Sequence, residues 1–561
     1  MRSLLGGRMP ATTPRARYRE VLRVLARHGF GFAVRPQFWP FGGASTETLE
    51  AEVFSRPSQL RQAFEELGTT FIKLGQILST RPDLLPPDYI AELQKLQDAV
   101  PPVPTPLIVA RIEAELGKPI AELFTTFDPT PLAAASIGQV HAVTLPGGID
   151  AVVKVQRPGV HAQVAVDLQI AARIAQLAEK RLNVAGRTGI DLPALVDEFG
   201  WTLRNELDYQ REAKNAEIFQ RNFAENPMVR IPAICWEYTT TRIITMERMR
   251  GYRIDDLAAL EAAGFPAATV AERSARIVLQ EVFEDGFFHA DLHPGNLFVL
   301  EDGVIGVIDF GMVGTIDQKT RTDLLFLLIA IVGQDTDQIT RYLYRLGIIG
   351  GGQTDHALLR RDIRRLVAQY YGVTLENLDI TTLLNDLLVI VRRHHLQFPL
   401  DLALLLKMLV MIEGLGRKLD PTFNVLAIAQ PFGQEAIARL FSPQFVVGQL
   451  KRAAIDYGEF AIELPVRLER LLSQLEQGDL LNKTAEMATT RATHALHVIA
   501  NRLIHGIANV ALLLALVLIF ITTRREGGSD SVLQIVFLVG VGALVVSSVS
   551  FLISVWRSRQ L

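Results

Sequence analysis

The stretch that decides the fold reads HADLHPGN, His289–Asn296, and thirteen residues after Asn296 the chain reads DFG, Asp309–Gly311. Asp291 can accept a proton from a hydroxyl group, and Asn296, five positions later, can hold a magnesium ion. Asp309 supplies a carboxylate for another magnesium ion, because a hard cation that bridges phosphates takes oxygen ligands. The two segments therefore predict the two halves of a phosphoryl-transfer centre.

The surroundings of these segments strengthen the prediction, since either one alone is common in ordinary loops and turns. Each borders a short apolar run, at residues 297–300 and 304–308, and the three residues between the runs favour a hairpin turn. Such a hairpin places Asn296 just before one strand and Asp309 just after the next. Both side chains are then expected at the same end of the hairpin.

A loop of small residues, AAASIGQV at 133–140, lies where a kinase carries its phosphate-covering pattern G-x-G-x-x-G-x-V. Alanine replaces two of the three glycines, which restricts the close approach of backbone to phosphate. A plain turn between two strands is the alternative interpretation. The residues that we expect to contact nucleotide are Ala133, Ala134, Ala135, Ser136, Gly138 and Val140.

Lys154 follows Val140 by fourteen residues, in the strand-like run Ala151–Val155. A strand lysine at this offset can pair with the α- and β-phosphates and with a glutamate of a later helix, whereas a surface lysine is the alternative. Residues 195–219 read as one helix that carries Glu206, Asp208 and Glu212. Asp208 and Glu212 are four apart and would share a face, and the spacing does not choose between Glu206 and Glu212 as the partner.

Four signatures together resemble the UbiB/AarF family of atypical kinases, which is linked to ubiquinone and other isoprenoid-quinone biology. They are KLGQ at 73–76, the alanine loop ending in SIGQVH at 136–141, Lys154 followed by QRPG at 156–159, and ELD at 206–208 with Glu212 six residues on. The similarity runs from about residue 64 to about residue 314. This resemblance implies ATP and Mg²⁺ as cofactors, with ATP as a binding partner.

The resemblance also assigns roles to residues. Lys154 and Glu212 form the catalytic ion pair, Asp291 is the catalytic base, and Asn296 and Asp309 bind metal. Lys73, Gln76 and Glu206 belong to an N-terminal extension that folds over the active site and contacts the cofactor; Lys73 and Gln76, at i and i+3, share a helix face. Such an extension would occupy the place of a peptide substrate.

Two further features agree with weak activity on proteins. No Ala-Pro-Glu triplet follows Gly311, and helical periodicity begins again almost at once, near residue 317. His293 stands where protein serine/threonine kinases usually keep a lysine in the catalytic loop. We therefore expect ATP hydrolysis, or phosphorylation of a small or lipid-like substrate. Membrane lipids, isoprenoid-quinone intermediates and quinone-biosynthesis enzymes are the partners that the resemblance implies.

The composition of the chain limits its possible partners and its possible cysteine sites. The chain has 561 residues with 57 Lys and Arg against 60 Asp and Glu, so its near neutrality gives no reason to expect nucleic acid as a partner. The only cysteine, Cys235, excludes an intrachain disulfide and a cysteine metal site.

Two C-terminal apolar runs, 503–523 and 532–556, are long enough to span a bilayer, and the polar link 524–530 between them predicts an antiparallel transmembrane hairpin. Buried helices of a soluble domain are the alternative. The balance of flanking arginines favours a cytosolic kinase-like domain, and hence a multi-pass membrane protein with two C-terminal helices. Residues 440–501 are amphipathic, which suits core packing or a helix at the membrane interface.

The predicted fold class is α+β: a two-lobed protein-kinase-like fold with a helical N-terminal extension and a C-terminal transmembrane hairpin. The expected domains are the extension at 1–105, the N-lobe at 106–250, the C-lobe at 251–420, an amphipathic helical region at 421–502 and the hairpin at 503–561. Two other functions stay open. One is a small-molecule phosphotransferase of the aminoglycoside/choline kinase type, and the other is a non-catalytic, nucleotide-sensing membrane scaffold.

Overall fold

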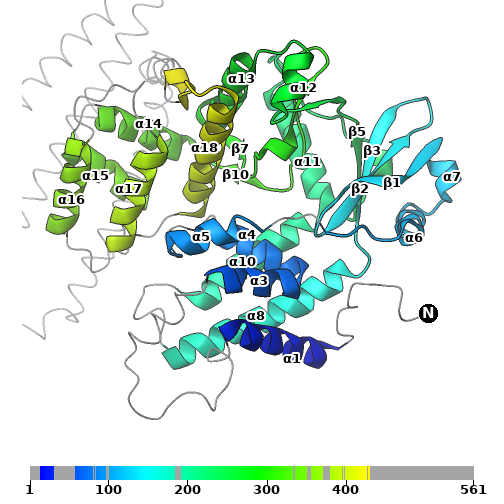
Figure 1. Cartoon of the computed structure of the whole chain (residues 1–561), viewed down its shortest axis with the longest axis horizontal. Coiled ribbons are helices and arrows are strands. Elements are labelled where there is room, and N and C mark those ends of the chain that lie inside the picture. Colours follow the sequence, from blue (N-terminus) through cyan, green and yellow to red (C-terminus); the bar gives the residue numbers. More distant parts are fainter. Residues whose placement is uncertain are drawn as a thin grey trace, which may run out of the picture. The chain divides into compact units, whose positions relative to one another are not determined.

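The computed structural model of the chain (Figure 1) describes residues 13–30, 57–79, 81, 84–96, 100–182, 191–332, 335–349, 356–369, 380–394, 396, 399–425 and 427–429. All of them lie in the first of two compact units, Met1–Ser442. The description below concerns these residues only.

The N-terminal extension is helical, as its periodicity predicts. Its helices are α1 (Pro14–Leu25), α3 (Pro57–Leu67), α4 (Thr69–Leu78) and α5 (Pro87–Leu93). They pack on one another and on the long helix α8 (Val160–Leu182), and Figure 1 shows this group, in blue and cyan, below the rest of the molecule. The buried side chains between them include Val21, Phe64, Leu67, Phe71, Leu93 and Ile170. The extension is therefore attached to the rest of the molecule through an apolar core.

A buried ion pair ties α1 to α8 within this helical group. Arg17 donates from Nε to Asp167 Oδ1 at 2.8 Å and from Nη2 to the Leu67 carbonyl at 2.7 Å. Asp167 is fully buried and also accepts the Thr70 hydroxyl at 2.7 Å. Three helices, α1, α4 and α8, thus meet at one carboxylate.

Replacement of Arg17 by Leu is expected to lower the free energy of unfolding by about 3–5 kcal/mol, because the Asp167 carboxylate would stay buried without its counter-charge. Urea unfolding followed by circular dichroism measures the loss. Arg19→Leu, at an exposed position of the same helix, is the matched control and should change little. Equal midpoints for Arg17→Leu and the control would contradict the assignment.

The first sheet is antiparallel with the strand order β1 (Thr126–Ala134), β2 (Gly138–Thr144), β3 (Asp150–Gln156) and β5 (Ile243–Glu247). The strand-like run Ala151–Val155 is confirmed as part of β3. Helix α6 (Thr105–Leu116) packs on one face, where its Ile108 and Ile112 meet Val153 and Val155. The other face carries Lys154, so alternation along β3 separates the core side from the site side.

The single helix predicted at 195–219 is wrong, because the structure has two helices there. Helix α10 (Leu192–Glu206) ends before Leu207, and α11 (Tyr209–Asn222) begins after Asp208. The Asp208 side chain accepts the Gln210 N–H at 3.1 Å and so caps α11. Asp208 therefore lies outside the helix that carries Glu212, and the two do not share a helical face.

The second half of the described chain has one large core, which lies between α13 (Ala267–Gln280) and α18 (Leu400–Leu419) and the strands beside them. Strands β8 (Leu297–Leu300) and β9 (Ile305–Val307) form the predicted hairpin, with Gly303 at φ 76° in its turn. Strand β7 (Phe287–His289) pairs with β10 (Val313–Thr315). These pairings bring the two ends of the HADLHPGN–DFG region together.

The remaining strands and helices complete the described part of the chain. Strand β9 also pairs in parallel with β4 (Val229–Arg230), and β8 pairs with β6 (Gly251–Arg253). The other helices are α7 (Ile120–Leu123), α12 (Leu257–Ala262), α14 (Gln318–Val332), α15 (Thr336–Arg345), α16 (His356–Gln369) and α17 (Ile380–Arg393). The helix predicted after DFG, near residues 317–331, is confirmed as α14.

The membrane prediction is corrected. Within the described part of the chain, no helix combines the length and the apolar composition that a bilayer span requires. The apolar helix α18 illustrates the reason, since charged residues occur along its length: Asp401, Lys407, Glu413, Arg417 and Lys418. The runs 503–523 and 532–556, and the amphipathic segment 440–501, lie outside the described residues. We therefore do not retain a multi-pass membrane protein with a cytosolic catalytic domain.

Candidate active site

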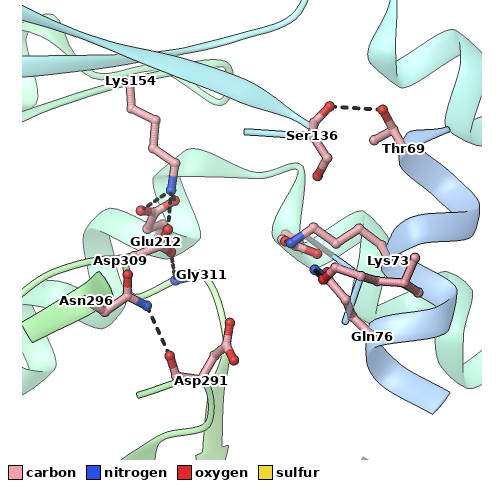
Figure 2. A network of polar contacts seen from close by, with 12 residues as sticks. Thr69, Lys73, Gln76, Ser136, Lys154, Glu212, Asp291, Asn296, Asp309 and Gly311 are labelled. Carbon is pink, nitrogen blue, oxygen red and sulfur yellow. Dashed lines mark hydrogen bonds and ion pairs between the residues drawn. The ribbon is translucent and has the colours of Figure 1, made fainter. Parts of the chain in front are cut away.

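Lys154 of β3 lies between two carboxylates (Figure 2). Its Nζ is 2.8 and 3.0 Å from the two carboxylate oxygens of Glu212 on α11, and 3.2 Å from Asp309 Oδ2. The side chain of Glu206 pairs elsewhere, with Lys73. The choice that spacing left open, between Glu206 and Glu212 beside Lys154, is therefore Glu212 in the structure.

The two carboxyl groups that share the Lys154 ammonium, those of Glu212 and Asp309, have shifted pKa values of opposite direction. Burial raises the pKa of Glu212 to about 7, against the opposing effect of Lys154. Burial alone would also raise the pKa of Asp309, but Lys154 and then Lys73 outweigh it and hold that pKa well below its ordinary value. Burial alone would lower the pKa of Lys154, but Asp309 and Glu212 raise it well above the usual value. Asp309 is thus ionised, and the local excess of carboxylate suits an added cation.

Asp309 is held in an unusual backbone conformation. Its φ is 63°, in the left-handed region that aspartate and asparagine tolerate better than most residues. The following Phe310 is fully buried against Phe219, with ring centroids 5.0 Å apart, and its carbonyl accepts the Asn215 amide at 2.9 Å. Anchoring of Phe310 under α11 keeps the Asp309 carboxylate directed at Lys154.

The HADLHPGN loop is connected to the DFG segment by the buried His289. Its Nδ1 accepts the Asp291 N–H at 3.1 Å, and its Nε2 lies 3.2 Å from the carbonyl of Ile308, the residue before Asp309. A carbonyl can only accept, so the proton is on Nε2 and the ring is neutral. Burial lowers the pKa of His289, which agrees with a neutral ring. One imidazole therefore fixes the spacing of both segments.

Asn296 is oriented by the same loop. Its Nδ2 donates to the Asp291 carbonyl at 3.0 Å, which turns Oδ1 away from that carbonyl. Figure 2 shows Asn296 and Asp309 side by side below Lys154, with Asp291 at the other end of the loop. His293 serves the loop itself, since its Nδ1 accepts the Gly295 N–H at 3.0 Å.

The partner of Asp291 comes from a distant helix. Lys407 of α18 places its Nζ 2.8 Å from Asp291 Oδ1. Burial alone would raise the pKa of Asp291, but the Lys407 ammonium outweighs burial and lowers it. The sequence reasoning did not assign Lys407 to the site. The available signal was a single lysine, Lys407, in the strongly apolar sequence at 384–410.

A second buried carboxyl, Glu281, supports His289. It lies in the helical turn Glu281–Asp285 and accepts the His289 N–H on Oε2 at 3.0 Å. Its other oxygen is buried and has no hydrogen-bond partner among the described residues. Burial raises the pKa of Glu281 to about 8, so the folded protein keeps this group protonated at neutral pH.

Stability is therefore expected to fall as pH rises from about 4.5 to about 8, because the unfolded chain releases this proton near 4.5 and the folded chain holds it to about 8. Glu281→Gln keeps the neutral form at every pH and should lose less stability than wild type over this window. Urea midpoints at pH 5 and pH 8 measure the difference. Glu261→Gln, an exposed control, should follow wild type, and an equal loss in Glu281→Gln would contradict the expectation.

The alanine loop joins β1 to β2. Ala133 and Ala134 pair with Val140 and Gln139, and the Ala135 N–H donates to the Gly138 carbonyl at 2.8 Å, which closes the turn. Close packing explains why the third glycine of the pattern, Gly138, is retained. A Cβ at this position would lie 2.3 Å from the Tyr209 hydroxyl oxygen. Ser136 is fully buried.

Helix α4 contacts this loop and faces the site. The Thr69 hydroxyl donates to the Ser136 carbonyl at 3.0 Å, and Lys73 Nζ lies 2.5 Å from Glu206 Oε1. Gln76 donates to the Leu96 carbonyl at 3.3 Å. In Figure 2, Lys73 and Gln76 extend from α4 toward the side that carries Asp291, opposite the strand that carries Lys154. The structure thus brings the extension next to the other candidate residues, and the charge of Lys73 affects both Asp309 and Asp291.

The residues fit Mg²⁺ bound together with phosphates. Within the described residues, no group of three or more His, Cys, Asp or Glu side chains could hold a metal ion. Magnesium in nucleotide sites uses one or two protein oxygens and takes the rest from phosphate and water. Asn296 Oδ1 and the ionised Asp309 carboxylate are the oxygens that could serve, and Lys154 could balance phosphate charge beside them.

Comparison with known proteins agrees with this geometry. The family model described as the ABC1 atypical kinase-like domain matches residues 95–343, and the UbiB helical domain matches residues 363–424, which include Lys407. A probable protein kinase UbiB of Marinobacter nauticus is 38% identical over 425 residues, 75% of this chain and 77% of that protein.

Two further similarities extend over most of the chain. An uncharacterized protein of Synechocystis is 36% identical over 504 residues, 88% of this chain and 86% of that protein. The solved structure of the Rv3197–erythromycin complex from Mycobacterium tuberculosis aligns with a TM-score of 0.46 at 24% identity, over 69% of this chain and 98% of that one. The protein has a protein-kinase-like atypical fold of mixed α and β content, and it belongs to the UbiB family of ABC1-type atypical kinases.

Proposed function

We propose that this chain binds Mg-ATP and catalyses ATP hydrolysis or phosphoryl transfer to a hydroxyl group of a small or lipid-like substrate. The observation that carries the proposal is Lys154, held between Glu212 and Asp309 by contacts of 2.8–3.2 Å. Three segments that are distant in sequence supply this cluster. A surface lysine would not need two carboxylates, one of them buried, whereas a phosphate-binding lysine needs one carboxylate to orient it and a metal ligand beside it.

The side chains then have separable roles. Lys154, oriented by Glu212, neutralises phosphate oxygens, and Asn296 with Asp309 holds magnesium, which would supply charge neutralisation at the transferred group. Asp291 accepts the proton of the attacking hydroxyl or water. The loop residues Ala133, Ala134, Ala135, Ser136, Gly138 and Val140 cover the phosphates, at a backbone distance that their alanines limit.

Several features support a non-protein substrate. Helix α4 brings Lys73 and Gln76 next to the site, where Lys73 pairs with Glu206 at the end of α10. Part of the chain thus already lies beside the residues proposed to act on the substrate. The described chain passes from Gly311 through the three-residue strand β10 into α14, which begins at Gln318. A long segment that could hold a peptide is therefore lacking between these described residues.

The biological role that we propose is support of isoprenoid-quinone biosynthesis, with quinone intermediates or the enzymes that make them as partners. This part rests on the family membership alone. Quinones and their precursors should be profiled in a deletion strain of the source organism, complemented with wild type or with Asp309→Asn. Restoration by wild type but not by the variant is the expected result, and an unaltered quinone profile in the deletion strain would contradict the role.

Turnover of ATP by the purified full-length chain tests the biochemical proposal. Mg²⁺-dependent release or transfer of phosphate is expected, with transfer to casein or another general protein acceptor much slower than hydrolysis. Tight Mg-ATP binding without any turnover would instead favour the nucleotide-sensing scaffold. Rapid phosphorylation of aminoglycosides or choline would favour the small-molecule phosphotransferase, and absence of ATP binding would exclude all three.

A further inference from the structure

Lys407 donates a hydrogen bond to the Asp291 carboxylate. The helix that carries it, α18, packs against α13 and β10, and its neighbours Leu404, Leu405 and Met408 are buried in the large core. The Lys407 side chain, by contrast, is 23% exposed and ends 2.8 Å from Asp291 Oδ1. An apolar helix thus presents one ammonium group to the proposed catalytic loop. That placement calls for an explanation beyond packing, since a buried methionine or leucine would fill the same volume at lower cost.

Two other charges act on the Asp291 carboxylate, those of His293 in the same loop and of Lys73 on α4. The neutral ring of His289 accepts the backbone N–H of Asp291. Among the described residues, however, only Lys407 donates a hydrogen bond to the carboxylate, and it does so to Oδ1. Oδ2 accepts no hydrogen bond from them and remains the oxygen that can take a proton.

The catalytic loop itself lacks a lysine at this point. His293 stands at the corresponding sequence position, but its Nδ1 is engaged with the Gly295 N–H, 3.0 Å away. A positive charge reaches the Asp291 carboxylate from α18 instead. It is carried by Lys407, 116 residues after Asp291 in the sequence. The helical region after the kinase-like domain therefore contributes a residue to the site.

We infer that Lys407 is a positioning residue for the reaction proposed above: its hydrogen bond fixes Oδ1 of Asp291, so that Oδ2 is directed to receive the substrate proton. The inference rests on the proposed function. It also means that the catalytic loop is complete only when α18 is docked on it, which couples the UbiB helical domain to catalysis.

The test uses Lys407→Met in the full-length chain, with Lys418→Met as the matched control. Lys418 is on the same helix and also faces a carboxylate, Asp255 at 3.5 Å, outside the site. Lys407→Met is expected to lower kcat for ATP by roughly 10–100-fold, the usual effect of losing a residue that orients a directly acting side chain. The Kd for Mg-ATP should stay nearly unchanged. Lys407→Arg retains a hydrogen-bond donor for Asp291 Oδ1 and should restore kcat to near the wild-type value.

A double-mutant cycle separates positioning from folding. If Lys407 acts through Asp291, adding Lys407→Met to Asp291→Asn should lower kcat little further. Lys407→Met and Lys418→Met should have similar melting temperatures. An unchanged kcat in a folded Lys407→Met protein, additive losses in the cycle, or faster turnover in the variant would each overturn the inference alone. A wild-type chain without ATP turnover would overturn the proposed function and this inference together.

Discussion

Replacement of Asp291 by Asn is expected to lower kcat for ATP turnover by about 10²–10⁴-fold, the usual contribution of a positioned general base. Asparagine has the same shape and still offers Oδ1 to Lys407, which lies 2.8 Å away in wild type. It cannot take up the substrate proton. Lys154 pairs with Glu212 and Asp309, whereas the Asp291 carboxylate pairs with Lys407. The affinity for Mg-ATP should therefore change by no more than about twofold.

Single-turnover assays of phosphate release, together with nucleotide binding by calorimetry, separate these two quantities. Asp302→Asn is a suitable control, because Asp302 is exposed in the β8–β9 turn, where it pairs with Arg230 and accepts the Val304 N–H. Its turnover should equal that of wild type. Equal rates for wild type and Asp291→Asn would remove Asp291 as the base and leave nucleotide binding as the supported activity.

Replacement of Asp309 by Asn is expected to abolish the dependence of ATP binding on Mg²⁺. The Asp309 carboxylate is the strongest candidate ligand for Mg²⁺. Loss of a residue that only supports a metal ligand lowers metal affinity by roughly 10–100-fold, and removal of the ligand itself should cost at least as much. Asparagine tolerates the left-handed conformation that Asp309 adopts at φ 63°, so the backbone should be retained. The effect can therefore be attributed to the lost charge.

Titration of ATP at fixed and at zero Mg²⁺ measures this dependence for wild type and variant. Asp317→Asn is the matched control, because Asp317 caps α14 through the Thr320 N–H at 2.7 Å and asparagine caps a helix equally well. It should bind Mg-ATP as wild type does. Retention of a Mg²⁺-dependent affinity by Asp309→Asn would place the metal on other ligands.

Local chemistry made much of the fold predictable. The β8–β9 hairpin follows from two apolar runs around a glycine turn, and Gly303 indeed takes a positive φ there. Asn296 precedes the first strand of this hairpin and Asp309 follows the second, so the hairpin alone brings them to the same end. Their proximity could therefore be predicted from the sequence. The helical extension is similar, because Phe64, Leu67 and Phe71 recur at helical spacing and all three are buried in its core.

Competition between local signals explains the main error in the helices. Residues 195–219 have a continuous helical period, but Asp208 offers its carboxylate to the N–H two residues later and starts a new helix. Periodicity does not register such a break. The consequence is functional, since Glu206 closes one helix and reaches Lys73, whereas Glu212 lies in the first turn of the next and reaches Lys154.

Long-range pairing was beyond sequence reasoning. The contact of Lys407 with Asp291 depends on how α18 docks on α13 and β10, and no local pattern encodes that packing. The assignment of Lys73 and Gln76 to the site came only from the family resemblance, because their spacing shows a shared face and not what the face meets. His289 was visible as part of a motif, yet its two hydrogen bonds required the fold.

The most direct measurement is the structure of the full-length chain crystallised with Mg²⁺ and a non-hydrolysable ATP analogue. We expect the metal on the Asp309 carboxylate and Asn296 Oδ1, the triphosphate beside Lys154, and the Lys154–Glu212 pair retained. Nucleotide bound away from Lys154, or a metal coordinated without Asp309, would contradict a single magnesium–nucleotide site formed by these residues.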